Sequence, residues 1–82
     1  MNKKITVLNG YNKKMYCIVD AELDLSKQLE KIMDAGSHGV GVEVTDKHIA
    51  LRDYFHAENI FVYPIVSIEE TELELSLKWN EI

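Results

Sequence analysis

Hydrophobic and polar side chains alternate strictly through the C-terminal segment of the chain. From Thr71 onward one side carries leucines and the tryptophan, while the other carries mostly charged residues: Leu73, Leu75, Leu77 and Trp79 against Glu72, Glu74, Ser76 and Lys78. A period of two is typical of a half-buried strand. Glutamate is a mediocre strand former, so packing of the leucine face must hold such a strand in place. We therefore expect a closing strand from Thr71, entered by a turn at residues 69–70 and anchored by its leucines.

Residues 3–8 and 14–20 are predicted to form a hairpin. Asn9-Gly10 between them is a strong turn signal. A two-residue turn would place polar residues opposite apolar ones, whereas a five-residue loop at 9–13 gives two apolar pairs, Ile5 with Cys17 and Val7 with Met15. Because register follows the buried face, the longer loop is favoured.

The spacing of apolar residues predicts one helix, at about residues 25–35. Four of them recur at i, i+4, i+7 and i+8 and form a single stripe: Leu25, Leu29, Ile32 and Met33. Asp24 is a suitable N-cap, where its carboxylate also suits the helix dipole. Gly36 is a natural C′ residue. The stripe is expected to be part of the core.

Residues 40–45 alternate again, with Val40, Val42 and Val44 inward. A turn at residues 46–47 would lead into a strand at 48–52 and place Val44 opposite Ile49 and Thr45 opposite His48. The competing interpretation makes Asp46 an N-cap and residues 47–57 a second helix. We favour the hairpin.

An irregular link at residues 53–59 precedes a strongly apolar strand at residues 60–68. Pro64 interrupts this strand. Since proline donates no ladder hydrogen bond, the strand is expected to lie at an edge, or to be bulged or bent there.

These elements predict one globular α+β domain over residues 1–82. Its small, mostly antiparallel sheet, in the order β-β-α-β-β-β-β, carries the helix at about 25–35 on one face. A small curled barrel with the helix plugging one end is the alternative.

The net charge of −5 is unevenly distributed. Residues 1–19 contain four lysines and no acid, whereas residues 20–82 contain fourteen acids and five basic residues. Binding to nucleic acid through its phosphates needs a basic surface, so direct nucleic-acid binding is not expected. No apolar run approaches a membrane span, and the start of the chain lacks a signal-peptide core. The single cysteine, Cys17, cannot form an internal disulfide, and we expect a soluble cytoplasmic protein.

No motif dictates a chemistry. The three histidines, His38, His48 and His56, show no close pair of the kind that zinc sites use. The glycine-rich segment 36–41 closes a helix and opens a strand, which is the reverse of a phosphate-binding loop. Gly39 and Gly41 are instead expected to allow close approach of another segment. Cys17 lies in an apolar setting, which raises a thiol pKa. Asp53 and His56 are spaced to pair, but one such pair is common by chance. We expect no enzyme activity, no metal and no cofactor.

Two candidate binding surfaces follow from the pattern. The first is an acidic face that contains Glu70, Glu72 and Glu74. Alone it is too sparse to imitate duplex DNA, so mimicry would require Glu43, Asp20, Glu22 or the helix acids to join the same surface. The second is an aromatic patch that contains Arg52, Tyr54, Phe55 and His56, because tyrosine and arginine are common in interface hot spots.

The sequence therefore predicts a small acidic protein-interaction module, an inhibitor or regulator whose acidic face docks on a basic protein partner. In size, acidity and lack of a catalytic motif the chain is similar to small phage-encoded inhibitors, including anti-CRISPR proteins. The alternative is a small-ligand-binding or structural subunit that acts as a homo-oligomer. A homodimer through a sheet edge or the aromatic face is compatible with both.

Overall fold

The computed structural model, which describes residues 1–36 and 38–82, is an antiparallel six-stranded sheet with one short helix. In chain order the elements are β1 (Asn2–Leu8), β2 (Lys14–Asp20), α1 (Leu25–Ile32), β3 (Val40–Val44), β4 (His48–Asp53), β5 (Glu58–Thr71) and β6 (Ser76–Glu81). The predicted α+β class with an antiparallel sheet is confirmed, although the helix is a minor part of it. None of the described helical residues form a segment long and apolar enough to cross a membrane.

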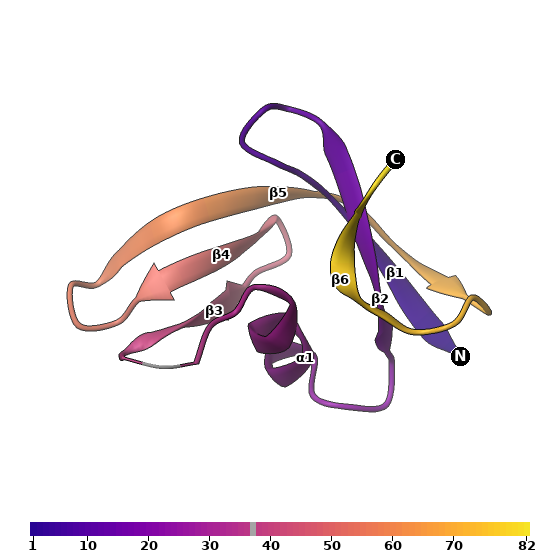
Figure 1. The fold of residues 1–82 in the computed structure, drawn as a ribbon, viewed down its shortest axis with the longest axis horizontal. Helices are drawn as coiled ribbons and strands as arrows, with labels where there is room; N and C mark the ends of the chain where they lie inside the picture. Colours follow the sequence, from indigo (N-terminus) through magenta and orange to yellow (C-terminus); the bar gives the residue numbers. More distant parts are fainter. Residues whose placement is uncertain (37) are drawn as a thin grey trace.

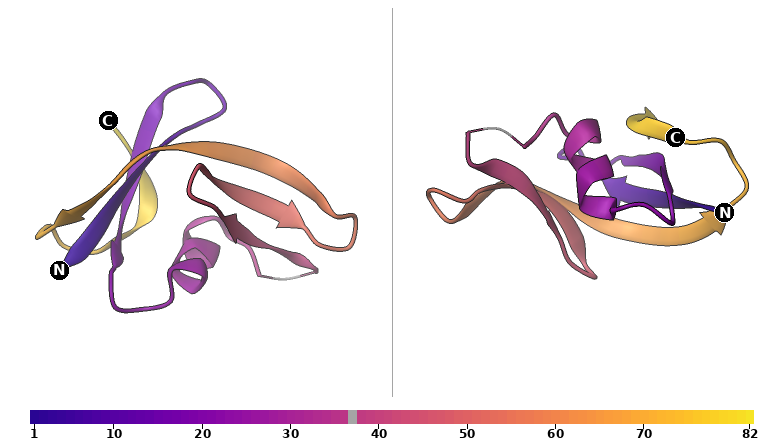
Figure 2. Two further views of the ribbon diagram at one scale, coloured as in Figure 1. Left: turned by 180° about the vertical axis from the view of Figure 1, so that it is seen from behind. Right: turned by 90° about the horizontal axis from the view of Figure 1, so that it is seen from below.

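The sheet is bent around the helix. Its strand order is β3-β4-β5-β1-β2-β6, so β3 and β6 form the two outer edges. Figure 1 shows the long strand β5 arching over the molecule and joining the β3–β4 hairpin to the β1–β2–β6 part. The helix α1 lies on the concave side, where it contacts β2, β3 and β6 (Figure 2).

Strand β5 changes partner near Pro64. Its first half pairs with β4 up to the Pro64–His48 pair, and its second half pairs with β1 from Ile65 onward. The β1 register shifts between Thr6 and Val7, which leaves Val66 as the extra residue of a bulge. Since proline cannot donate to a ladder, the junction between two partners is a position that tolerates it. The predicted irregularity near Pro64 is thus confirmed.

Both predicted hairpin registers are confirmed. Strand β1 pairs Ile5 with Cys17 and Val7 with Met15, across the loop 9–13. Strand β3 pairs Val44 with Ile49, and the Thr45 amide donates to the His48 carbonyl at 2.9 Å. The alternative helix at residues 47–57 is wrong, because His48–Asp53 is strand β4. Apolar matching across the strands decided each register.

The core lies between the concave side of the sheet and α1. Its fully buried large side chains come from three strands, β1, β2 and β4, and from the helix: Ile5, Val7, Cys17, Val19, Leu29 and Ile49. The rest of the predicted helix stripe, Leu25, Ile32 and Met33, packs against this core while half-buried. The stripe is therefore core, as expected.

The ends of the helix follow its caps. Asp24 accepts hydrogen bonds from the amides of Ser26 at 2.9 Å and Lys27 at 3.4 Å, which confirms the predicted N-cap. The predicted end at about residue 35 is wrong, because α1 ends at Ile32. Asp34 adopts φ 52°, a left-handed conformation that aspartate tolerates, and so takes the C′ position predicted for Gly36.

The buried Gln28 joins the helix to the sheet. Its Oε1 accepts from the Asp20 amide at 2.7 Å, and its Nε2 donates to the Asp20 carbonyl at 2.9 Å. Gln28 is only 6 % exposed, and a buried amide needs hydrogen-bond partners within the protein. The Asp20 backbone supplies a partner for each end of the amide. This contact fixes how the chain passes from β2 into α1.

The structure differs most from the sequence prediction at the closing strand. Residues 69–70 are not a turn but part of β5, which continues to Thr71 because β1 supplies partners as far as Asn2. The chain turns at residues 72–75, and the last strand, β6, begins only at Ser76. Leu73, Leu75 and Leu77 are 55, 49 and 38 % exposed, so the leucine face does not anchor the chain end. Trp79 alone packs against the core from that face.

The Cys17 thiol offers a test of this core. It is fully buried, and burial raises its pKa from the ordinary value of 9.0 to about 12. Because the folded state holds this proton more tightly than the unfolded state, the thiol leaves stability unchanged below about pH 9 and lowers it as the pH rises toward 12. We expect a thiol reagent such as dithionitrobenzoate to react with unfolded protein in urea but hardly at all with native protein at mildly alkaline pH. Rapid labelling of the native protein would contradict this burial.

Candidate functional site

The three glutamates predicted to share a strand face lie in two different elements. Glu70 is in β5, and Glu72 and Glu74 are in the turn before β6. All three side chains are exposed. The face predicted from their alternation is therefore not a strand face, but the residues remain close together because the chain reverses there.

A second acidic segment reaches the same end of the molecule. Asn2 pairs with Asp20 of β2 on one side and with Thr71 of β5 on the other, and its Nδ2 donates to the Leu73 carbonyl at 2.8 Å. The turns that follow β2 and β5 therefore both lie near the N terminus (Figure 1). We call this the acidic end; it comprises Asp20, Glu22, Glu69, Glu70, Glu72 and Glu74.

Two lysines of β1 reduce the charge of the acidic end. Lys3 lies opposite Glu70 and Lys4 lies opposite Glu69. The Lys4 ammonium also lies over the Tyr16 ring, 4.6 Å from its centroid. The carboxylates still outnumber these lysines, so the acidic end keeps a negative field that added salt would screen.

Glu43 does not join the acidic end. It pairs with Ala50 of β4, and its carboxylate bridges His48 at 2.9 Å and Arg52 at 3.7 Å. His48 and Arg52 flank Ala50 on the same face of β4, which explains why Ala50 is fully buried there. Of the acids that the sequence left open, Asp20 and Glu22 contribute to the surface and Glu43 does not.

The predicted aromatic patch lies in and beside the β4–β5 loop. The Asp53 carboxylate accepts the amides of Phe55 at 3.0 Å and His56 at 3.2 Å, and contacts His56 Nδ1 at 2.8 Å. The side-chain hydrogen bond to His56, followed by the backbone bonds, lowers the pKa of Asp53. Asp53 and His56 therefore pair, as their spacing allows, and this pairing fixes the shape of the loop.

The rings of the patch lie on two glycines, Gly39 just before β3 and Gly41 within it. A methyl group at Gly39 would come within 2.2 Å of the Phe55 ring, and one at Gly41 within 3.0 Å of the Tyr54 ring. These glycines therefore allow the close approach expected of them. The Arg52 guanidinium lies 5.6 Å from the Tyr54 centroid. The structure brings the predicted residues together, with Tyr54 and Phe55 still 56 and 80 % exposed.

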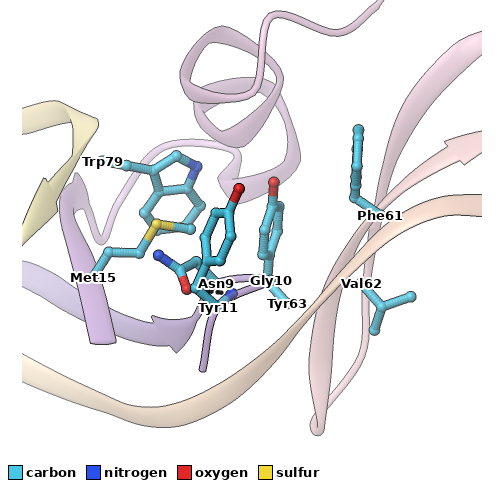
Figure 3. Close-up of a pocket in the computed structure, with 8 residues that line it drawn as sticks. All are labelled: Asn9, Gly10, Tyr11, Met15, Phe61, Val62, Tyr63 and Trp79. Atoms are coloured by element: carbon cyan, nitrogen blue, oxygen red, sulfur yellow. Dashed lines mark hydrogen bonds between the residues drawn. The ribbon is translucent and has the colours of Figure 1, made fainter. Parts of the chain in front are cut away.

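A second aromatic cluster, which the sequence did not single out, lines a groove of about 570 Å³. Figure 3 shows its residues, which come from the β1–β2 hairpin, from β5 and from β6, with the Val62 side chain directed away from the rings: Asn9, Gly10, Tyr11, Met15, Phe61, Val62, Tyr63 and Trp79. We call this the aromatic groove. The pairing of Phe61 with Tyr63 on one strand face is visible in the sequence, but the arrival of Tyr11 and Trp79 is not.

Three rings of the aromatic groove lie next to one another, with Tyr63 between Phe61 and Trp79. Phe61 and Tyr63 are nearly parallel, with centroids 6.5 Å apart, and Tyr63 meets Trp79 at 6.1 Å with a tilt of 57°. Both separations are typical of favourable aromatic pairs. Asn9 fixes the hairpin loop, because its Oδ1 accepts the Tyr11 amide at 2.8 Å and the Lys13 amide at 3.1 Å. The groove is thus a defined surface lined by uncharged side chains.

The three histidines lie in different places, and two of them contact different carboxylates. His48 contacts Glu43 and His56 contacts Asp53, while His38 lies in the loop before β3. Within residues 1–36 and 38–82, no three histidine, cysteine or carboxylate side chains gather as metal ligands would.

Comparison of the chain with models of protein families, with characterised proteins and with solved structures finds no match. Its function is therefore inferred from the geometry of the molecule itself.

Proposed function

We propose that this chain is a small protein-interaction module, an inhibitor or regulator that docks its acidic end on a basic surface of a partner protein. The observation that supports the proposal is that two acidic segments, one around Asp20 and one that includes Glu70, flank Asn2 of β1 at the same end of the sheet. Neither segment is long enough to form such a surface alone.

The charges serve mainly to select and steer the partner. Exposed ion pairs contribute about 1 kcal/mol or less each, so the acidic end alone does not produce tight binding. Complementary charge raises the rate of association and disfavours acidic partners. Contacts that exclude water must supply the rest of the affinity.

Inhibition follows from occupancy. A basic surface on the partner that normally holds a polyanion is covered while the acidic end is bound, and the polyanion is displaced. The module acts in this proposal by binding and performs no chemistry on its partner.

A salt series tests the proposal. The tagged protein is used to capture partners from a lysate of its native host, and the bound fraction is eluted with increasing salt. We expect a basic protein whose apparent affinity falls steeply as salt rises, because the Debye length shortens from about 10 Å at 0.1 M to about 3 Å at 1 M. Capture of a partner whose binding does not respond to salt would contradict docking through the acidic end.

A second candidate function is binding of a small molecule in the aromatic groove. The volume of about 570 Å³ lies within the range of about 300–1,000 Å³ that ligand sites occupy. This function predicts thermal stabilisation by a small molecule and indifference to substitutions at the acidic end.

A further inference from the structure

We propose that the aromatic groove receives a cationic side chain, arginine or lysine, from the basic partner. This inference rests on the proposed function and assigns the groove a part in it: the acidic end attracts a basic surface, and the groove holds one of its side chains.

The ring faces of the groove suit a cation. The face of an aromatic ring carries negative charge density and attracts ammonium and guanidinium groups within about 6 Å of its centroid. Tyr11, Phe61, Tyr63 and Trp79 all line the groove, together with uncharged residues. Elsewhere in the molecule tyrosine rings already hold cations in this way, with Lys4 over Tyr16 and Arg52 over Tyr54.

A carboxylate lies on the groove side of the sheet. Glu81 of β6 pairs with Met15, a groove residue, and is two positions from Trp79, so it projects from the same face. Lys14 precedes Met15 and therefore points to the opposite face. Glu81 therefore places a negative charge on the groove face while Lys14 lies on the other face, which favours a cation over an anion or a neutral group.

The position of the groove suits a side chain that is part of a larger surface. Tyr11 and Phe61 are 87 and 55 % exposed, so the rings are accessible from outside the molecule. Hydrophobic contact of an arginine or lysine stem with the rings excludes water and adds to the attraction of the charged group. This is the water-excluding contact that the acidic end lacks.

A matched pair of peptides tests the proposal. The peptide Gly-Gly-Arg-Gly-Gly is compared with the same peptide carrying citrulline, which replaces the guanidinium by a neutral urea of nearly equal shape. Trp79 is the single tryptophan and lies in the groove, so its fluorescence and indole N–H resonance report binding directly. We expect the arginine peptide to bind about two- to thirtyfold more tightly, which is the range that about 0.5–2 kcal/mol per cation–π contact corresponds to.

Variants locate the binding. Phe61→Leu removes an exposed ring, and Glu81→Gln removes the nearby charge; each is expected to weaken the arginine peptide about two- to fivefold. Glu58→Gln, an exposed charge change outside the groove, is the matched control and is expected to have no effect. If Phe61→Leu lowers the melting temperature, Tyr11→Leu replaces it, because Tyr11 is almost wholly exposed.

Equal affinity for the two peptides would overturn the proposal, as would a lack of effect of the groove variants or no binding of either peptide. None of these results bears on the acidic end, whose role is tested by salt and by substitutions there. The proposed function fails, independently of the groove, if partner capture persists at high salt and after substitutions at the acidic end.

Discussion

Replacement of Leu29 by alanine is expected to lower the free energy of unfolding by about 3 kcal/mol, within the range of about 2–5 kcal/mol for such core truncations. Leu29 is fully buried and is the only completely buried large side chain that α1 supplies within the described residues. The helix contacts β2, β3 and β6, so the lost methyl groups leave a cavity where the two edges of the sheet meet the helix. A chain of this length has a thin core and little surplus stability.

Urea unfolding followed by circular dichroism measures this effect. Leu23→Ala is the control, since Leu23 is 62 % exposed and its truncation is expected to change stability by less than about 0.5 kcal/mol. If the two variants were equally stable, α1 would not be packed against the sheet as described.

Reversal of three charges at the acidic end is expected to abolish capture of a basic partner. In the triple variant Glu70→Lys, Glu72→Lys and Glu74→Lys each substitution adds two positive charges, so the net charge moves from −5 to +1. All three side chains are exposed, so the fold is expected to survive. Like charges facing each other across an interface cost several kcal/mol, which corresponds to a loss of affinity of at least about a hundredfold.

A second triple variant separates the position of the charges from their number. Glu30→Lys, Asp46→Lys and Glu58→Lys give the same net charge but lie outside the acidic end. Calorimetric titration against the captured partner is expected to show nearly wild-type affinity for this control after its fold is verified. Equal loss in both triple variants would show that only the net charge matters, and unchanged affinity in the first would remove the acidic end from the interface.

The elements whose partners lie nearby in the sequence were predictable from it. The hairpins β1–β2 and β3–β4 have the registers that apolar matching requires, because a one-residue slip would expose Val7 or Ile49. The helix stripe around Leu29 was equally clear, as was its cap at Asp24. The end of the helix was not, because aspartate at residue 34 takes a conformation for which Gly36 was the more obvious residue.

The C-terminal segment shows what periodicity leaves open. Alternation states which side chains share a face, but not where a strand ends or what covers that face. Strand β5 runs to Thr71 because β1 supplies hydrogen-bonding partners that far. The leucines that follow it, Leu73, Leu75 and Leu77, remain exposed. Only Trp79 reaches the core, beside Tyr63 of β5.

The fold and the candidate binding surfaces depend partly on local sequence and partly on tertiary structure. The sequence by itself determined the fold class, two hairpin registers, the core stripe of the helix and the concentration of acids after residue 19, since these depend on local spacing and composition. Tertiary structure alone decided that Asp20 of β2 and Thr71, which follows Glu70 in β5, lie on either side of Asn2, and that Tyr11 and Trp79 join Phe61 and Tyr63 around one groove. The reason is physical: the groove lies near the point where β5 changes partners, and the acidic end lies where β5 ends beside β1. Long-range pairing of this kind is set by the burial of the whole core rather than by any local pattern.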